Sequence, residues 1–374
     1  MRVEFIGIAR TADASETTIE VGAAIDPDYL YRIVRTHEQS GFDRVLVTQT
    51  SSAPDGFILA DQLLNATARI GVLLVHRPGF VAPTVAARMF ATLDALHPGR
   101  VAVHVSTGGE DADQVMDGDF IAKAARYRRT GEFLDIVRLA WRSQAPFDYS
   151  GEFYRVTGAR SAIRPGRGHL PIYFAGASSE AIRIGGRHAD VYTFWGEPLA
   201  GFRELIGRVR AAGAGEDRTI DRFCVSLRPI AAATKTAAWR RARELLELAH
   251  AHAGARAERL AEPQAEGSRR LLRYAADADL HDKRLWTALS RATGAPGNST
   301  ALVGSYEQVA ESLLDYVAAG ASTLLIRGYD PLGDAAAYGD LIRLVHDQVG
   351  DDIDGYRSRR AEGDELGRLT TAAS

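Results

Sequence analysis

The sequence predicts an α/β fold, a TIM (β/α)8 barrel, on the basis of three observations. Eight short runs rich in β-branched residues recur along the chain, and amphipathic helical patterns separate them. Most of these runs are continuously apolar, as is typical of parallel strands that helices cover. No GxGxxG turn follows any run, which disfavours the alternative of a doubly wound dinucleotide-binding sheet.

The elements follow one another in regular order. The eight predicted strands are Val3–Ile8, Arg44–Thr48, Ile70–Val75, Val101–Ser106, Pro171–Ala175, Asp190–Trp195, Phe223–Ile230 and Thr323–Arg327. Helical patterns between them include Pro27–Gly41, Val81–His97, Ala122–Ser143, Ser178–His188 and Tyr306–Gly320. Several of these helices end at a glycine, which is a common C-terminal stop signal.

Two connections are too long for simple strand–helix units. Residues 108–170, after the fourth strand, contain a long helix and an alternating segment at 147–160 that predicts a small hairpin. Residues 232–298, after the seventh strand, predict a helical insertion, and residues 291–300 are the best candidate for a mobile lid. We expect residues 1–348 to form a single domain and the charged tail 349–374 to be loosely ordered.

Composition excludes several classes of function. The 374 residues include 45 Lys and Arg against 48 Asp and Glu, and this net charge of −3 gives no general attraction to nucleic acid or anionic membranes. The single cysteine, Cys224, excludes a disulfide framework, a Cys-rich zinc site and an iron–sulfur cluster. Neither a membrane span nor a secretory signal is visible, so we expect a cytoplasmic protein.

Active sites of barrels of this kind lie at the C-terminal ends of the strands. Here those ends carry small, hydroxyl, aromatic and arginine side chains, with no paired carboxylates for glycoside hydrolysis and no metal-ligand cluster. The segment Gly176-Ala177-Ser178-Ser179 ends a strand and opens a helix, so it predicts either a phosphate cradle or a simple helix N-cap. The segment 106–109 predicts either a place where a flat ring approaches the backbone or a tight turn.

Six segments together resemble one family. The sequence resembles the flavin-dependent alkanesulfonate monooxygenases, a branch of the bacterial-luciferase-like superfamily. The matching segments are HRPGFVAPTVAARMFATLDALHPGR (76–100), STGGEDADQVMDGDF (106–120), GEFYRVTGAR (151–160), PIYFAGASSEA (171–181), DVYTFWGEP (190–198) and TALVGSYEQVAESLLDYVAAGASTLLIRGY (300–329).

This resemblance implies a particular chemistry. Reduced FMN, delivered by a separate NAD(P)H:FMN reductase, would react with O₂ to give a flavin peroxide that oxygenates a small organic substrate. The candidate substrates are a sulfonate, another organosulfur compound or a metabolite of a specialised pathway. The resemblance also implies a homodimer or homotetramer and an insertion that closes over the site. It implies no nucleic acid and no membrane partner, and no metal.

The resemblance also assigns roles to individual residues. Ser178 and Ser179, with the neighbouring Gly176 and Ala177, match the family's phosphate-binding segment, and Tyr127 matches a tyrosine that reaches the same phosphate. Thr107 matches a residue beside the flavin ring, Trp195 one that lines the substrate pocket, and Tyr329 a phenol near the oxygen site. Each residue also has a purely structural alternative. These alternatives are an N-cap for the serines, a core position for Tyr127, packing at the top of the barrel for Trp195 and a lid contact for Tyr329.

The sequence departs from the family pattern where the substrate is bound. Ala53 stands in place of a cysteine, and Ser226-Leu227-Arg228 stands in place of Arg-x-His. Arg228 stays charged, so it can donate hydrogen bonds and stabilise an anion but cannot act as a general base; its alternative role is a salt bridge. Two other functions stay open: an F420-dependent oxidoreductase, and a flavin-binding protein that has lost catalysis.

Overall fold

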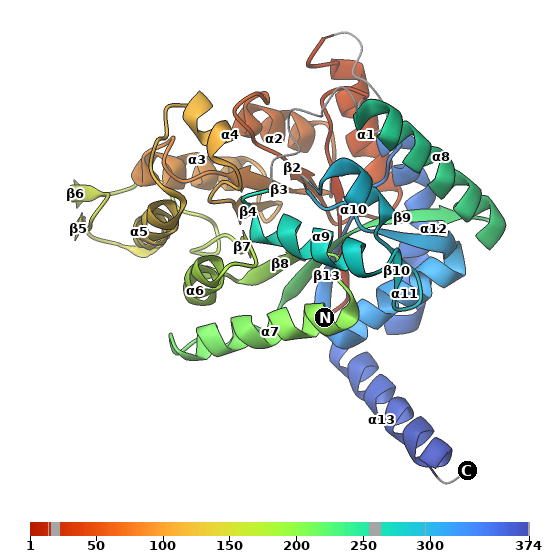
Figure 1. The fold of residues 1–374 in the computed structure, drawn as a ribbon. Helices are drawn as coiled ribbons and strands as arrows, with labels where there is room; N and C mark the ends of the chain where they lie inside the picture. The colour runs from red at the N-terminus through yellow and green to blue at the C-terminus, as the bar shows by residue number, and fades with distance from the viewer. Residues whose placement is uncertain (14, 16–22, 254–262, 296, 373–374) are drawn as a thin grey trace.

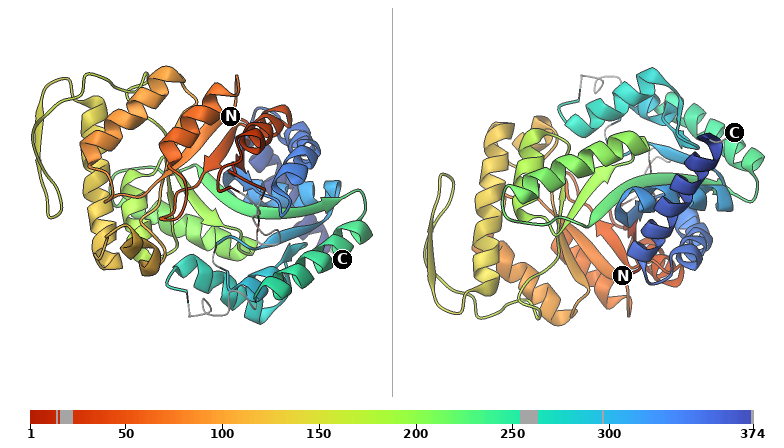
Figure 2. Two further views of the ribbon diagram at one scale, coloured as in Figure 1. Left: turned by 90° about the horizontal axis from the view of Figure 1, so that it is seen from above. Right: turned by 90° about the horizontal axis from the view of Figure 1, so that it is seen from below.

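Eight parallel strands close into a barrel (Figures 1 and 2). The computed structural model describes residues 1–13, 15, 23–253, 263–295 and 297–372. The barrel strands are β1 (Glu4–Ile8), β2 (Arg44–Val47), β3 (Gly71–His76), β4 (Val101–Val105), β7 (Ile172–Ala175), β8 (Val191–Trp195), β9 (Phe223–Ala232) and β13 (Ala321–Ile326). Pairing of β13 with both β9 and β1 closes the ring, which confirms the predicted fold class.

Helices surround the barrel wall, as Figure 2 shows from both ends. They are α1 (Pro27–Gln39), α2 (Gly56–Asn65), α3 (Pro83–Leu96), α4 (Asp111–Met116), α5 (Lys123–Arg142), α6 (Ser179–His188), α7 (Leu199–Ala214), α8 (Lys235–Ala253), α9 (Glu266–Asp277), α10 (Ala288–Thr293), α11 (Tyr306–Ala319), α12 (Pro331–Val349) and α13 (Ile353–Ala372). None of the helices in the described ranges is long and apolar enough to cross a membrane.

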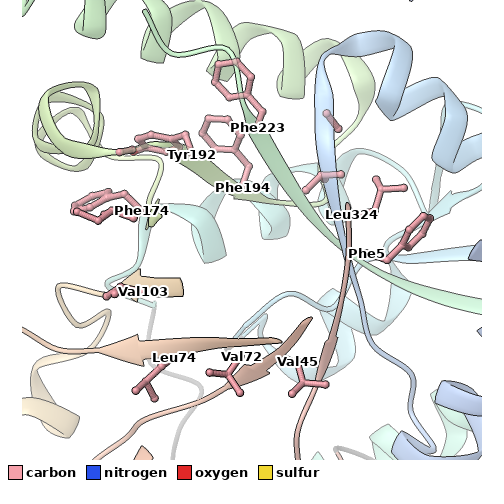
Figure 3. Close-up of a cluster of buried hydrophobic side chains, with 14 of the residues drawn as sticks. Phe5, Val45, Val72, Leu74, Val103, Phe174, Tyr192, Phe194, Phe223 and Leu324 are labelled. Atoms are coloured by element: carbon pink, nitrogen blue, oxygen red, sulfur yellow. The ribbon is translucent and has the colours of Figure 1, made fainter. Parts of the chain in front are cut away.

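Alternate residues of each strand serve two different cores. One set packs outward against the helices and includes Phe5, Val45, Val103 and Phe174, which Figure 3 shows with other members of that layer. The intervening set fills the barrel interior: Ile6, Leu46, Leu73, Ala102, Tyr173, Val191, Cys224 and Leu325. Because side chains alternate along a strand, these interior residues define which later positions point into the mouth of the barrel.

The two long connections contain additional structure. The hairpin predicted near 147–160 is confirmed as β5 (Phe147–Ser150) paired antiparallel with β6 (Arg155–Ala159), and it stands beyond α5 at the edge of the molecule (Figure 1). The second connection adds β10 (Leu280–His281), β11 (Leu285–Trp286) and β12 (Ala301–Ser305), which extend from β9 outside the barrel. The sequence did not predict this small sheet.

The charged tail begins as a packed helix. Ile353 and Tyr356, in the first turns of α13, are buried, and Arg357 donates hydrogen bonds to the carbonyl oxygens of Val317, Gly320 and Ala321. This first part of the tail is therefore docked on the barrel, in contrast to the loose order that its composition suggested. Its contacts with α11 explain the difference, because two apolar residues at i and i+3 suffice to anchor one helical face.

Candidate active site

The mouth of the barrel is identified by strand alternation. On β9 the interior residue Cys224 is followed two and four positions later by Ser226 and Arg228, and on β13 the interior Leu325 is followed by Arg327. On β8 the same rule places Trp195 four positions beyond the interior Val191. These side chains therefore belong to the C-terminal end of the barrel, where sites of this fold are built.

Arg228 and Tyr329 form a stacked pair. The guanidinium carbon of Arg228 lies 3.6 Å from the centroid of the Tyr329 ring, and its Nη2 donates to the carbonyl oxygen of Gly328 at 2.9 Å. Both side chains are almost fully buried. A cation held over an aromatic face away from water is worth about 2 kcal/mol, so each side chain fixes the orientation of the other. The structure thus brings together two of the three residues that we expected to be catalytic.

Ser178, Tyr127 and Gly176 meet where β7 ends and α6 begins. Ser178 is the N-cap of α6, and its Oγ accepts a hydrogen bond from the backbone N–H of Ala181 at 3.2 Å. Burial raises the pKa of Tyr127, and a hydrogen bond with Ser178 opposes that rise. Gly176 has φ of +140°, a backbone conformation that glycine adopts readily.

The serine segment can still offer donors to a ligand. Ser178 Oγ accepts the Ala181 N–H, so the serine keeps its own proton to donate to Tyr127 or to a ligand. The N–H groups of Ser179 and Glu180, at the start of α6, have no carbonyl partner within the helix. Ala177 is buried and Ser179 is exposed at the start of the helix. Ser178 is therefore a helix N-cap, and this structural role is compatible with phosphate binding.

Thr107 faces the neighbouring helix. Its Oγ1 lies 3.3 Å from Oγ1 of Thr130 on α5, and Thr130 in turn donates to the carbonyl oxygen of Arg126 at 2.9 Å. Since the Thr130 proton is used in that second bond, Thr107 is the donor in the first one. Its hydroxyl therefore presents only acceptor lone pairs to anything that approaches the loop after β4.

Helix α9 of the insertion covers the sector between β4 and β8. Trp195, which is half-buried, lies against the backbone of Gly267, where an added Cβ would come within 2.8 Å of the indole ring. Arg270 donates to both carboxylate oxygens of the buried Glu197, in the loop after β8, with a shortest distance of 2.7 Å. Just before α9, the N–H of Gln264 donates to Glu110, in the loop after β4. Helix α9 therefore forms a roof over this part of the barrel mouth, and Trp195 contacts that roof.

The segment 291–300, our candidate lid, covers the adjacent sector, although residue 296 lies outside the described residues. Asn298 Nδ2 donates to the carbonyl oxygen of Ser226 at 2.7 Å, and Thr300 Oγ1 donates to that of Gly196 at 2.7 Å. Arg327 donates to the carbonyl oxygen of Asn298 at 2.9 Å. In the structure this segment is bonded to β9 and to the residues that directly follow β8 and β13, and whether it opens stays a prediction.

One inward-facing residue was missed from the sequence. His104 follows the interior Ala102 on β4, and its Nδ1 is buried without a hydrogen-bond partner in the described part of the chain. Burial lowers the pKa of His104 to about 4, so its imidazole is neutral at pH 7. The signal was present in VAVHV, where the histidine is the one polar side chain in an otherwise apolar strand.

The predicted residues fall into two groups along the wall of the barrel. Tyr127, Thr107 and the segment 176–179 lie by β4 and β7, whereas Arg228 and Tyr329 lie by β9 and β13. Trp195, on β8, stands between the groups because the strand order is β4-β7-β8-β9-β13. One group offers neutral hydrogen-bond donors at a helix N-terminus, and the other offers a buried cation and a phenol.

A family comparison agrees with this arrangement. A profile described as luciferase-like monooxygenase matches residues 4–323. The chain belongs to the luciferase-like monooxygenase family. The match begins at the first barrel strand and ends within β13, the last one, so this luciferase-like family covers the first seven barrel strands, the start of β13 and both long connections.

Several solved structures share the fold of this luciferase-like chain. An EDTA monooxygenase (EmoA) from Chelativorans sp. BNC1 is 17% identical, with 96% of this chain and 98% of that chain covered and a TM-score of 0.75. The oxygenating constituent of 3,6-diketocamphane monooxygenase from Pseudomonas putida, solved with FMN, is 18% identical, with coverage of 94% and 98% and a TM-score of 0.64. An F420-dependent secondary alcohol dehydrogenase is 15% identical, with coverage of 92% and 99% and a TM-score of 0.68.

Proposed function

We propose that this chain is the oxygenase component of a two-component monooxygenase that uses reduced FMN and O₂ to oxygenate a small organic substrate. The observation that carries the proposal is the meeting of Tyr127, Gly176 and Ser178 at the N-terminus of α6, within a chain of the luciferase-like monooxygenase family. A separate NAD(P)H:FMN reductase would supply the reduced flavin. The EDTA monooxygenase and the FMN-bound 3,6-diketocamphane enzyme support the assignment by analogy of fold.

The residues present fit the phosphate of FMN. An added Cβ at Gly176 would lie 3.6 Å from the phenol oxygen of Tyr127, so glycine keeps the space beside that hydroxyl open. Ser178 Oγ, the Ser179 hydroxyl and the first-turn N–H groups are neutral donors beside the positive end of the helix dipole. Thr107, in the loop after the neighbouring strand β4, would present its acceptor lone pairs toward the flavin ring.

Arg228 and Tyr329 would act on the oxygen side of the flavin. Reduced FMN, when bound, supplies the two electrons that activate O₂. Arg228 keeps a fixed positive charge and donates hydrogen bonds, and the Tyr329 phenol can donate a proton or a hydrogen bond to developing negative charge. Trp195, under the α9 roof, would exclude water and contact the apolar part of the substrate. We propose an organosulfur compound such as a sulfonate as one substrate class.

Replacing Ser178 with aspartate tests the phosphate assignment. Aspartate is also a good N-cap, so Ser178→Asp keeps the bond to the Ala181 N–H while it adds a negative charge. Two like charges about 5 Å apart repel by about 3 kcal/mol at an effective dielectric constant of about 20, so we expect the Kd for FMN to rise by roughly 100-fold and the Kd for riboflavin to stay within about twofold. Fluorescence titration of the oxidised flavins measures both constants.

The matched control is Ser305→Asp, because Ser305 is likewise an N-cap, at the start of α11, and its side chain accepts the N–H of Gln308. This control leaves both Kd values unchanged. An equal loss of FMN and riboflavin binding in Ser178→Asp would reduce Ser178 to a structural cap. A further experiment is titration of the wild-type protein with reduced F420. If reduced F420 binds more tightly than reduced FMN, F420 and not FMN is the cofactor.

A further inference from the structure

The loop that carries Tyr329 is fixed by a single carboxylate. Asp334 Oδ2, in the first turns of α12, accepts hydrogen bonds from the backbone N–H groups of Tyr329 at 2.8 Å and Asp330 at 3.0 Å. Only 3% of Asp334 is exposed. A Cβ at position 328 would come within 2.0 Å of the Asp334 carboxylate, so Gly328 is what lets the carboxylate reach the loop backbone.

A cation from the insertion completes this arrangement. Arg241, on α8, contacts Asp334 twice, with Nη1 2.6 Å from Oδ1 and Nη2 2.9 Å from Oδ2. Such a bidentate ion pair fixes the plane of the carboxylate and balances its charge. Helix α8 follows directly from β9, the strand that carries Arg228.

These contacts form a closed circuit. Arg228 donates a hydrogen bond to Gly328 and lies over the Tyr329 ring. The backbone of Tyr329 is hydrogen-bonded to Asp334, which forms an ion pair with Arg241. Arg241 lies on α8, which follows β9, the strand that carries Arg228. Tyr329 also belongs to a buried hydrophobic cluster that includes Ile230 of β9 and Trp286, Ala288 and Leu289 of the insertion. The orientation of the pair is therefore set jointly by the barrel and by the insertion.

We propose that Asp334 and Arg241 are positioning residues that hold the Arg228–Tyr329 pair in its orientation and so couple the placement of helix α8 to the site. The functional meaning of this coupling rests on the proposed function, but the coupling itself does not. Removal of the Arg241 guanidinium leaves Asp334 with its backbone bonds only, so the loop at 328–330 gains freedom to rotate. Removal of any other exposed cation of α8 leaves the loop as it is.

The positioning can be measured without any cofactor by ¹⁹F NMR of protein labelled with 3-fluorotyrosine. The chain has 13 tyrosines, and the resonance that Tyr329→Phe removes is that of Tyr329. Arg241→Met shifts or broadens this resonance, whereas the control Arg240→Met, one residue earlier on α8 and 73% exposed, does not. Arg241→Lys restores the wild-type position in part. An unmoved Tyr329 resonance in a folded Arg241→Met protein overturns the proposal.

Asp334→Asn provides a second variant should Arg241→Met fail to fold, because the amide oxygen still accepts the two backbone hydrogen bonds while the ion pair is lost. A functional cycle follows on protein loaded with reduced FMN. Tyr329→Phe and Arg241→Met each speed the release of H₂O₂ after mixing with O₂ by at least about threefold, and the double variant is no faster than Tyr329→Phe alone.

Additive effects in this cycle would show that Arg241 does not act through Tyr329. Absence of flavin binding by the wild-type protein would overturn the proposed function and leave the NMR result standing. The two inferences therefore fail separately.

Discussion

Arg228, which stands where the sequence resemblance leads us to expect a histidine, makes contacts that suit a guanidinium group. Its guanidinium donates to a backbone carbonyl and lies flat on the Tyr329 ring, and both contacts use the planar shape of the group. A histidine could supply neither the charge at neutral pH nor this fork of donors. Arg228 therefore favours a site that stabilises negative charge over one that removes protons from its substrate.

Gly176 provides a test of the serine segment at the scale of one residue. Its φ of +140° disfavours any side chain, and an added Cβ would lie 2.5 Å from Cβ of Ala181. Gly176→Ala is expected to lower the free energy of unfolding by about 1–3 kcal/mol, because strain and a steric clash add. Urea denaturation measures this loss.

A matched glycine should give the opposite sign. Gly207, in the interior of α7, has no atom within 4 Å of an added Cβ, so Gly207→Ala is expected to stabilise the protein by about 1 kcal/mol. Equal effects of the two substitutions would show that the backbone at Gly176 relaxes freely.

At the scale of elements, the roof over the site is attached by a buried ion pair. Glu197 is 2% exposed and Arg270 is 9% exposed, and Arg270 also reaches Glu204 at 2.8 Å. Burial raises the pKa of Glu197, and the hydrogen bonds and charge of Arg270 oppose that rise. The carboxylate therefore depends on Arg270 to stay ionised inside the fold, and α9 depends on the same contact for its place.

Arg270→Met is expected to lower the free energy of unfolding by about 3–5 kcal/mol, because it leaves a buried carboxylate without its cation. The Glu197→Gln/Arg270→Met double variant removes both charges and should recover part of this loss. Arg208→Met, which breaks only the exposed i,i+4 pair with Glu204, should cost less than about 1 kcal/mol. Chemical denaturation compares the three, and a similar cost for Arg208 and Arg270 would contradict the assigned role.

The sequence predicts the barrel strands well because each one is a short apolar run, and such a run can be recognised without knowing which strands it pairs with. The short strands β10 and β11 have two residues each and carry no pattern at all. Strand β12 has a readable pattern, but its partner is the outer half of β9, which no local signal indicates.

The candidate site was predictable to a similar extent. Residue types at strand ends located Ser178, Arg228 and Tyr329 correctly at the C-terminal end of the barrel, but long-range contacts decide which of them meet. The pair formed by Arg228 and Tyr329 joins residues 101 positions apart. Likewise Asp334 and Arg241 appear in the sequence only as ordinary helix-surface charges.

At the scale of the whole molecule, buried histidines make the stability of the fold depend on pH. Burial lowers the pKa of His37 to about 4 and, with the nearby charge of Arg77, that of His76 to about 4, and burial with nearby arginines lowers the pKa of His188 to about 3. These imidazoles are neutral in the folded state and bind protons only when the chain unfolds. Acid therefore favours the unfolded state through all three, and through His104, whose pKa burial also lowers to about 4.

Stability is expected to fall as the pH drops from about 6.5, the usual histidine pKa, toward 4. Over that window each of the four histidines contributes up to about 1.4 kcal/mol per pH unit, so the free energy of unfolding is lower by roughly 5 kcal/mol at pH 5.5 than at pH 7. Urea titrations at the two pH values measure it. His76→Gln should flatten the dependence, and exposed His169→Gln should not; equal slopes for both variants would contradict this origin.

Strand β9 divides its hydrogen bonds between two sheets, and this division bears on how the protein can diversify. Residues Phe223–Leu227 pair with β13 inside the barrel, whereas Arg228–Ala232 pair with β12 outside it. The insertion therefore has its own register, set beyond the point where the barrel closes. Changes within residues 233–300 that keep the contacts of Arg241, Arg270, Asn298 and Thr300 with the barrel leave the pairing of its eight strands unaltered. The cover of the site can therefore differ in length and sequence over the same barrel.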